Sequence, residues 1–165
     1  MTRPLPKDAG PSIGSVSELV VREISLTETR PLRHAILRPH ETVESLTAHE
    51  PSDAFAVGVF DRGALVAVGF IGSDGERGTW RVRGMATVPA ARGKGAGSAV
   101  LDALLAHAVA RGASRVWCNV RAPARSLYER AGFRAVSEEF ELPDIGPHFV
   151  MERSTDGAPA TTGGP

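Results

Sequence analysis

A glycine-dense segment, GMATVPAARGKGAGS at residues 84–98, constrains the fold of this chain most strongly. It follows an apolar stretch and precedes a helical pattern, so it predicts a strand, a tight loop and the first turn of a helix. Free N–H groups at a helix start attract anions, and glycines let the backbone approach a ligand closely. With Arg92 and Lys94 beside the glycines, the segment predicts a phosphate-binding loop. A purely structural helix cap is the simpler alternative.

Two nucleotide-binding patterns fit this loop poorly. A P-loop requires Ser or Thr after Gly-Lys, but Lys94 is followed by Gly95. The dinucleotide pattern G-x-G-x-x-G, counted from Gly95, meets Val100 at its third glycine. The acidic residue that this pattern needs at the end of the next strand is replaced by Asn119. The loop therefore favours a different phosphate-bearing ligand.

Composition narrows the class of protein. Lys and Arg number 19, and Asp and Glu also number 19, which argues against a nucleic-acid partner. The single cysteine, Cys118, excludes a disulfide framework, and the histidines show no metal-ligand spacing, so no metal is expected. The longest apolar runs, at 54–60 and 64–72, are too short to span a membrane, and the N-terminus has no apolar signal-peptide core. We expect a cytoplasmic protein with no membrane partner.

The ends of the chain differ from its middle. Residues 1–17 and 154–165 are rich in Gly and Pro and lack apolar periodicity, so both are expected to be disordered tails. Residues 18–153 are expected to form one domain, because no linker or repeat divides them.

The middle alternates short apolar runs with helical patterns. Helices are expected at 25–39, along the apolar stripe from Val100 to Val109 that Gly112 closes, and at 123–131, with a loop or short irregular helix at 40–54. Ser25 or Thr27 is the expected cap of the first helix. The expected strands are 19–24, 55–60, 64–71, 80–88, 115–120, 135–142 and 148–153. The order is β-α-β-β-β-α-β-α-β-β, a mixed α/β layer fold.

Three motifs carry a resemblance to a known family. Residues 92–97 fit (Gln/Arg)-x-x-Gly-x-(Gly/Ala) and follow the strand segment Arg83–Pro89. The stretch NVRA at 119–122 precedes LYERAGF at 127–133, and IGPH begins at Ile145. In this order, over about residues 18–153, they closely resemble the GNAT superfamily of acyl-CoA-dependent N-acetyltransferases.

The resemblance implies the acyl-CoA N-acyltransferase fold: α/β, with a mixed, mostly antiparallel central sheet, a splayed parallel strand pair and flanking helices. In the family, pantetheine pairs with exposed strand backbone, a role that falls on Met85, Ala86, Thr87 and Val88. Asn119 and Arg121 are implied to lie near the cofactor's path. The pyrophosphate is implied to bind the loop amides of Arg92, Gly93, Lys94, Gly95, Ala96, Gly97 and Ser98.

The implied reaction moves an acetyl group from acetyl-CoA to a primary amine of a small molecule or a protein. Direct attack of the neutral amine forms a tetrahedral intermediate, whose oxyanion a backbone N–H near Met85 would stabilise. Tyr128 matches the family's acid and would also contact the cofactor; a phenol of pKa about 10 stays protonated at neutral pH. A packing role is the alternative for Tyr128.

The sequence does not identify the general base. The strand at 80–85 carries no carboxylate where many relatives have a glutamate. His148, Glu139 and a water chain are the alternatives, and His148 has a suitable ordinary pKa of about 6.5. His148 also fits a hydrogen-bonded turn residue.

Charge is segregated along the chain. Residues 77–97 are basic with no acid, whereas 39–61 and 138–144 are acidic with no Lys or Arg. Because the resemblance puts both acidic segments beside the acceptor, a cationic amine is expected, although solvated loop charge gives the same pattern.

Two alternative functions would share some of these sequence features. A catalytically inactive CoA-binding sensor or interaction domain of the same fold would keep the loop, and an unrelated nucleotide-binding protein would bind ATP or NAD. A homodimer is a further expectation of the resemblance.

Overall fold

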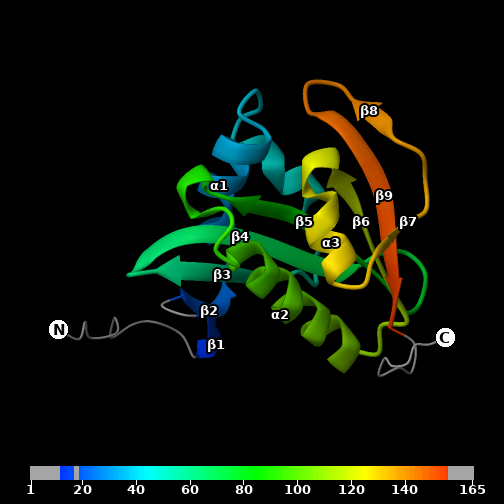
Figure 1. The fold of residues 1–165 in the computed structure, drawn as a ribbon, viewed down its shortest axis with the longest axis horizontal. Coiled ribbons are helices and arrows are strands. Elements are labelled where there is room, and N and C mark those ends of the chain that lie inside the picture. The colour runs from blue at the N-terminus through cyan, green and yellow to red at the C-terminus, as the bar shows by residue number, and fades with distance from the viewer. Residues whose placement is uncertain (1–11, 17–18, 156–165) are drawn as a thin grey trace.

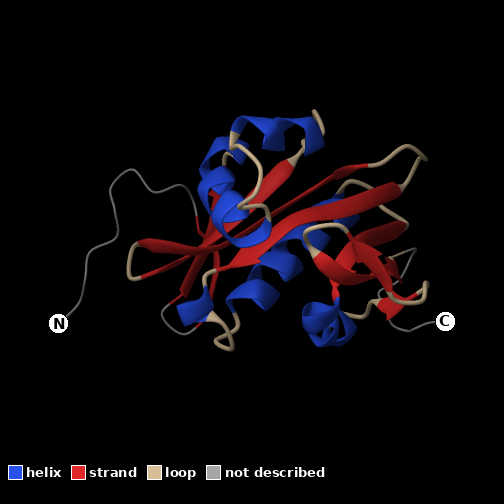
Figure 2. Ribbon diagram, turned by 90° about the horizontal axis from the view of Figure 1, so that it is seen from above, coloured by secondary structure: helices blue, strands red, loops and turns tan. Residues whose placement is uncertain are grey.

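The computed structural model describes residues 12–16 and 19–155, and this part of the chain forms one sheet with helices on both faces (Figures 1 and 2). The sheet order is β1-β2-β3-β4-β5-β6-β9-β7, with β8 paired to β9. The strands are β1 (Ser12–Val16), β2 (Leu19–Ile24), β3 (Phe55–Asp61), β4 (Ala64–Ser73), β5 (Thr79–Thr87), β6 (Arg115–Arg121), β7 (Arg134–Ala135), β8 (Phe140–Leu142) and β9 (Gly146–Ser154).

The helical elements are few and short except for α2. They are α1 (Leu26–Leu32), its π-helical continuation η1 (Arg33–Leu37), the 3-10 turns η2 (Glu44–His49), η3 (Pro89–Ala91) and η4 (Ala122–Ala124), α2 (Ala96–Ala110) and α3 (Arg125–Arg130). Within the described ranges, no helix is long and apolar enough to cross a membrane.

The strand pairing confirms the expected fold class. Neighbouring strands of the sheet run antiparallel except β5 and β6, which are parallel. This parallel pair is bonded only where Thr79–Arg81 lies beside Arg115–Trp117. Beyond those three residues the two strands diverge, and they form the splayed parallel pair that the family resemblance implies.

Alternation along the strands divides the core into two layers. Val57, Val59 and Val82 pack with the apolar stripe of α2 on one face of the sheet. Ala56 and Phe70 pack against α1 and η1 on the other. The period of two along each strand explains the division.

Local interactions explain where the first helix begins and how it ends. Ser25 is the N-cap: its Oγ accepts from the Glu28 N–H at 3.1 Å, and Glu28 Oε1 accepts from the Ser25 N–H at 2.8 Å. Pro31 lies inside α1, where a proline removes a backbone donor. The helix continues as a π-helical turn from Arg33 and ends at Leu37, two residues earlier than expected.

The boundaries of the domain differ from the sequence-based expectation. Ser12–Val16, placed in the first tail, forms β1 because it pairs antiparallel with the edge of β2. At the other end, β9 runs to Ser154, and Thr155 donates from Oγ1 to the Ala113 carbonyl at 2.6 Å. The rest of both expected tails lies outside the described residues. The expected strand 135–142 is two short strands, β7 and β8, that both pair with β9.

A bulge at Gly84 sets the direction of the side chains on β5. The register with β4 passes from Phe70↔Arg83 to Val68↔Ala86, which leaves an extra residue in β5. Gly84 has φ +67, a conformation that glycine adopts at little cost. The bulge shifts the alternation, so Arg83 lies on the α1 face whereas Met85 packs on the α2 side.

We predict that Gly84→Ala destabilises the fold more than Gly75→Ala. Both glycines have positive φ, at +67 and +73, so backbone strain of about 1–3 kcal/mol is common to both changes. A Cβ on Gly84 would lie 2.6 Å from Phe70 Cε1, whereas no atom of the described residues lies within 4 Å of one on Gly75. The clash should add about 1–3 kcal/mol to the loss of unfolding free energy, measured in urea. Equal losses of unfolding free energy in the two variants would contradict the predicted clash with Phe70.

Candidate active site

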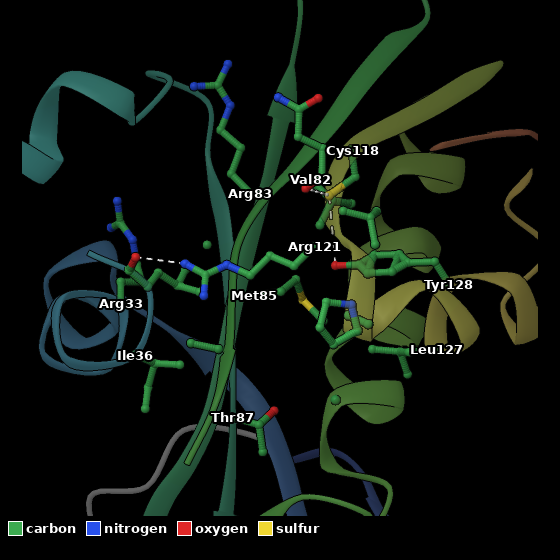
Figure 3. A pocket seen from close by; sticks show the side chains of 18 of the residues that line it. Arg33, Ile36, Val82, Arg83, Met85, Thr87, Cys118, Arg121, Leu127 and Tyr128 are labelled. Atoms are coloured by element: carbon green, nitrogen blue, oxygen red, sulfur yellow. Dashed lines mark hydrogen bonds between the residues drawn. The ribbon is translucent and has the colours of Figure 1, made fainter. Parts of the chain in front are cut away.

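A cavity of about 720 Å³ opens where β5 and β6 diverge. One end is formed by the loop before α2 and by α3, and the other by η1, η2 and the arginines of β5 and β6. Figure 3 shows Leu127 and Tyr128 on one side of β5, with Arg33 and Ile36 on the other. The gap in the sheet thus joins the two faces of the molecule.

The glycine loop forms the first end as an anion-binding cradle. Gly95 is the N-cap of α2 with φ 90, and no side chain of the described residues caps the helix. The N–H groups of a first helical turn have no acceptors within the helix and carry its positive dipole end. The side chain of Arg92 folds back, and its Nε donates to the Thr87 carbonyl at 3.2 Å. This end suits a phosphate or pyrophosphate.

Most of the sequence-predicted binding residues line this cavity. Those present are Met85, Ala86, Thr87, Arg92, Gly93, Gly95, Ala96, Gly97, Ser98, Asn119 and Tyr128. Lys94 and Val88 do not line it. Lys94 is exposed, and the N–H of Val88 donates to the Val66 carbonyl at 2.9 Å.

Tyr128 combines a packing role with access to the cavity. Its ring is buried at 3% exposure and meets Phe133 edge-on, with ring centroids 5.5 Å apart. Its hydroxyl accepts a hydrogen bond from Cys118 Sγ at 3.9 Å. Burial raises the pKa of Tyr128 well above its ordinary value, so the phenol is a proton donor at neutral pH. Burial also raises the pKa of Cys118, to about 12, which leaves its thiol neutral.

His148 is buried in the wall of the same cavity. Its Nδ1 lies 2.8 Å from the Gly146 carbonyl oxygen. Because a carbonyl can only accept, Nδ1 carries the hydrogen, and in the neutral ring Nε2 is free to take a proton. Glu139, the alternative base, is exposed and outside the cavity. Within the described residues no Asp or Glu lines the cavity.

The sequence did not reveal Arg33, Arg38 and His49 as residues of the second end, and it implied a place near the cofactor for Arg121. Arg33 of η1, Arg38 directly after η1 and His49 of η2 line it. Arg83 donates from Nη1 to the His49 carbonyl at 2.9 Å, and Arg121 from Nη2 to the Leu37 carbonyl at 2.8 Å. These partners are 34 and 84 positions apart, so no local motif could have indicated them.

Two glutamates of the acidic loop expected beside the acceptor are paired with arginines. Glu50 accepts from Arg33 Nη1 at 2.6 Å and from Arg30 Nη2 at 2.8 Å. Glu41 accepts from Arg38 Nη1 at 3.0 Å. Neither glutamate lines the cavity, and the expectation of an acidic acceptor wall is wrong. The acidic run at 39–61 gave a wrong expectation because its glutamates pair with Arg30 of α1, Arg33 of η1 and Arg38 directly after η1.

Comparisons with known proteins agree with this geometry. Residues 21–133 match the model of the acetyltransferase (GNAT) family. The chain is 33% identical over 143 residues to YitI of Bacillus subtilis (strain 168), described as an uncharacterized N-acetyltransferase, covering 82% of this chain and 96% of that protein.

Solved structures share the fold. The Escherichia coli ribosomal-protein-S18-alanine N-acetyltransferase superposes with a TM-score of 0.67 at 18% identity, covering 87% of this chain and 97% of that one. An acyl-CoA N-acyltransferase from Pseudomonas aeruginosa gives 0.65 at 23% identity, covering 82% and 98%.

Fold, cavity and family match together define the class of protein: the chain belongs to the GNAT family of acetyltransferases. It is therefore an N-acetyltransferase, as the motifs of the glycine loop and of LYERAGF predict.

We predict that Glu50→Gln strongly destabilises the protein at pH 7. The change leaves Arg33, only 4% exposed, without its counter-charge, which typically costs about 3–5 kcal/mol. Hydrogen bonds from Arg30 and Arg33 hold the pKa of Glu50 below its ordinary value. Its contribution is therefore present above pH about 4.3 and lost as pH falls through the lower folded pKa.

The deficit of the Gln variant in urea unfolding should therefore shrink on acidification. Glu138→Gln, a change at an exposed position, is the control and should alter the unfolding free energy little. A deficit that is small at pH 7, or that is independent of pH, would contradict the role assigned to Glu50.

Proposed function

We propose that this acetyltransferase moves the acetyl group of acetyl-CoA to a primary amine. The observation that carries the proposal is one cavity that connects an anion cradle at the start of α2, through the gap between β5 and β6, to Tyr128 and His148. A donor with a pyrophosphate at one end and a reactive thioester at the other matches a cavity of this form.

The cradle and the diverging strands supply the donor site. The N–H groups at the start of α2, with Arg92, suit the pyrophosphate. Met85–Thr87 of β5 and Asn119 of β6 line the path between the two strands, which no longer bond to each other there. The donor supplies an acetyl thioester, and the chain orients it.

Tyr128 is the proposed acid. Its phenol lines the cavity and keeps its proton at neutral pH, because burial raises its pKa. A proton from Tyr128 would neutralise the leaving thiolate as the C–S bond breaks. The N–H of Met85, at the bulge of β5, is the proposed donor to the developing oxyanion.

Proton removal from the amine does not use a carboxylate of the described wall, which has none. His148, through Nε2 or a bound water, is the proposed acceptor of that proton. The arginines at the other end help, because nearby positive charge lowers the pKa of an ammonium group and favours the neutral, nucleophilic amine.

We predict that Tyr128→Phe lowers kcat for thiol release by about 100-fold or more, the usual contribution of a positioned acid. The ring is kept, so thermal stabilisation by acetyl-CoA should be retained. Phe133→Leu is the matched control: it disturbs the same aromatic contact from outside the cavity, and should lower stability without lowering kcat.

The same assays separate the rival functions. Wild-type protein that is stabilised by acetyl-CoA but releases no thiol with any amine would identify an inactive CoA-binding domain. Stabilisation by ATP or NAD and not by acetyl-CoA would identify a nucleotide-binding protein. Full activity of the Phe variant would contradict the role of Tyr128.

A further inference from the structure

The acceptor end of the cavity is a positively charged wall. Five arginines line it: Arg33, Arg38, Arg81, Arg83 and Arg121. No carboxylate from the described residues accompanies them in the lining. Figure 3 shows Arg33 and Arg121 extending toward the same region beside β5.

Three of these arginines have carboxylate partners behind the wall. Arg33 is paired with Glu50 at 2.6 Å and Arg38 with Glu41 at 3.0 Å. Arg83 lies 3.9 Å from Asp74, whose other oxygen accepts from Trp117 Nε1 at 2.8 Å. Their charges are largely satisfied within the protein.

Arg81 and Arg121 form no ion pair with a carboxylate among the described residues, although the charge of Asp74 acts on Arg81 at longer range. The Arg81 guanidinium lies 4.5 Å from the centre of the Trp117 ring, and its Nε is buried without a hydrogen bond. Arg121 donates only to the neutral carbonyl of Leu37. Burial lowers the pKa of both guanidinium groups, so both charges are poorly solvated. A buried charge without a counter-charge is costly, and an anion would relieve that cost.

These two arginines do not belong to the phosphate cradle. On β6, Cys118 and Val120 pack into the core beneath α2, so Asn119 and Arg121 point to the opposite face by alternation. On β5, Val82 packs into the same core, so Arg81 points with Arg121 toward the α1 face. The cradle lies at the start of α2, with its own arginine, Arg92.

We propose that the acceptor is a small amine carrying a carboxylate or phosphate group, which binds Arg81 and Arg121. This inference rests on the proposed function. In the reaction, the amine nitrogen bonds to the acetyl carbon and the C–S bond breaks. The ammonium group first loses one proton to His148 or water, so that the neutral amine attacks, and the nitrogen loses a second proton to water as the amide forms. The Tyr128 proton passes to the thiolate and Tyr128 regains a proton from water, which gives an N-acetylated anion, free CoA thiol and one released proton.

The test compares amines that differ in charge. Thiol release from acetyl-CoA is measured with L-glutamate against L-glutamine, with O-phosphoethanolamine against ethanolamine, and with putrescine as a cation. In at least one pair the anionic member should have a kcat/KM about tenfold higher or more, and should exceed putrescine. The pair that responds identifies carboxylate or phosphate as the recognised group.

Variants that remove one positive charge test whether Arg81 and Arg121 bind the anionic group of the acceptor. Arg81→Gln and, separately, Arg121→Gln should raise KM for the preferred anion about tenfold or more, while stabilisation by acetyl-CoA stays unchanged. Arg134→Gln, at a side chain 79% exposed on β7, removes the same charge outside the cavity and should leave KM unchanged. An equal rise in KM in all three variants would overturn the inference.

The outcomes separate this inference from the proposed function. If acetyl-CoA binds but no anionic amine outperforms its neutral partner, or putrescine is best, the inference fails and the donor site stands. If acetyl-CoA neither stabilises the protein nor is consumed with any amine, both fail.

Discussion

The short parallel pairing of β5 with β6 is the constraint on which the rest of the site depends. Three residues of each strand are bonded, and the strands then separate. A sheet that stayed paired would fill the gap with backbone hydrogen bonds and separate the two faces. Divergence leaves strand backbone facing a cavity, brings the start of α2 to one end, and leaves the other end to α1, η1 and η2. The Gly84 bulge turns Arg83 to one face and Met85 to the other in the same strand.

In the proposed function, electrostatics divides the cavity between two anionic ligands. The donor end uses backbone dipoles and Arg92, whereas the acceptor end uses side-chain guanidinium groups. The second arrangement depends on Glu50, which offsets the burial of Arg33. Within the part of the chain that the structure describes, Arg81 and Arg121 form no ion pair with a carboxylate, and such an arrangement is costly unless a ligand completes it. The described wall has no carboxylate. This agrees with the proposal, because a carboxylate there would repel an anionic acceptor and would keep the ammonium group of the acceptor charged.

Local features of the fold could be predicted from the sequence, and long-range ones could not. The Ser25 cap, the α2 stripe and the glycine loop follow from residues close together in the chain, and the parallel pair followed from the family motifs. The β1 strand was missed because Gly and Pro conceal a segment whose order comes from pairing with β2. The charge of the acceptor wall was misjudged because a run of acidic residues does not reveal its partners. Glu50 is satisfied by Arg33, 17 positions away.

The most direct measurement of the central claim is a structure of this protein bound to CoA. The proposed geometry places the pyrophosphate at the start of α2 and the pantetheine between β5 and β6 along Met85–Thr87. The sulfur should lie within hydrogen-bond reach of the Tyr128 hydroxyl, with Arg81 and Arg121 left free on the far side. CoA phosphates bound by Arg81 and Arg121, or a CoA sulfur remote from Tyr128, would contradict the proposed orientation of the cofactor in the cavity and the roles assigned to its two ends.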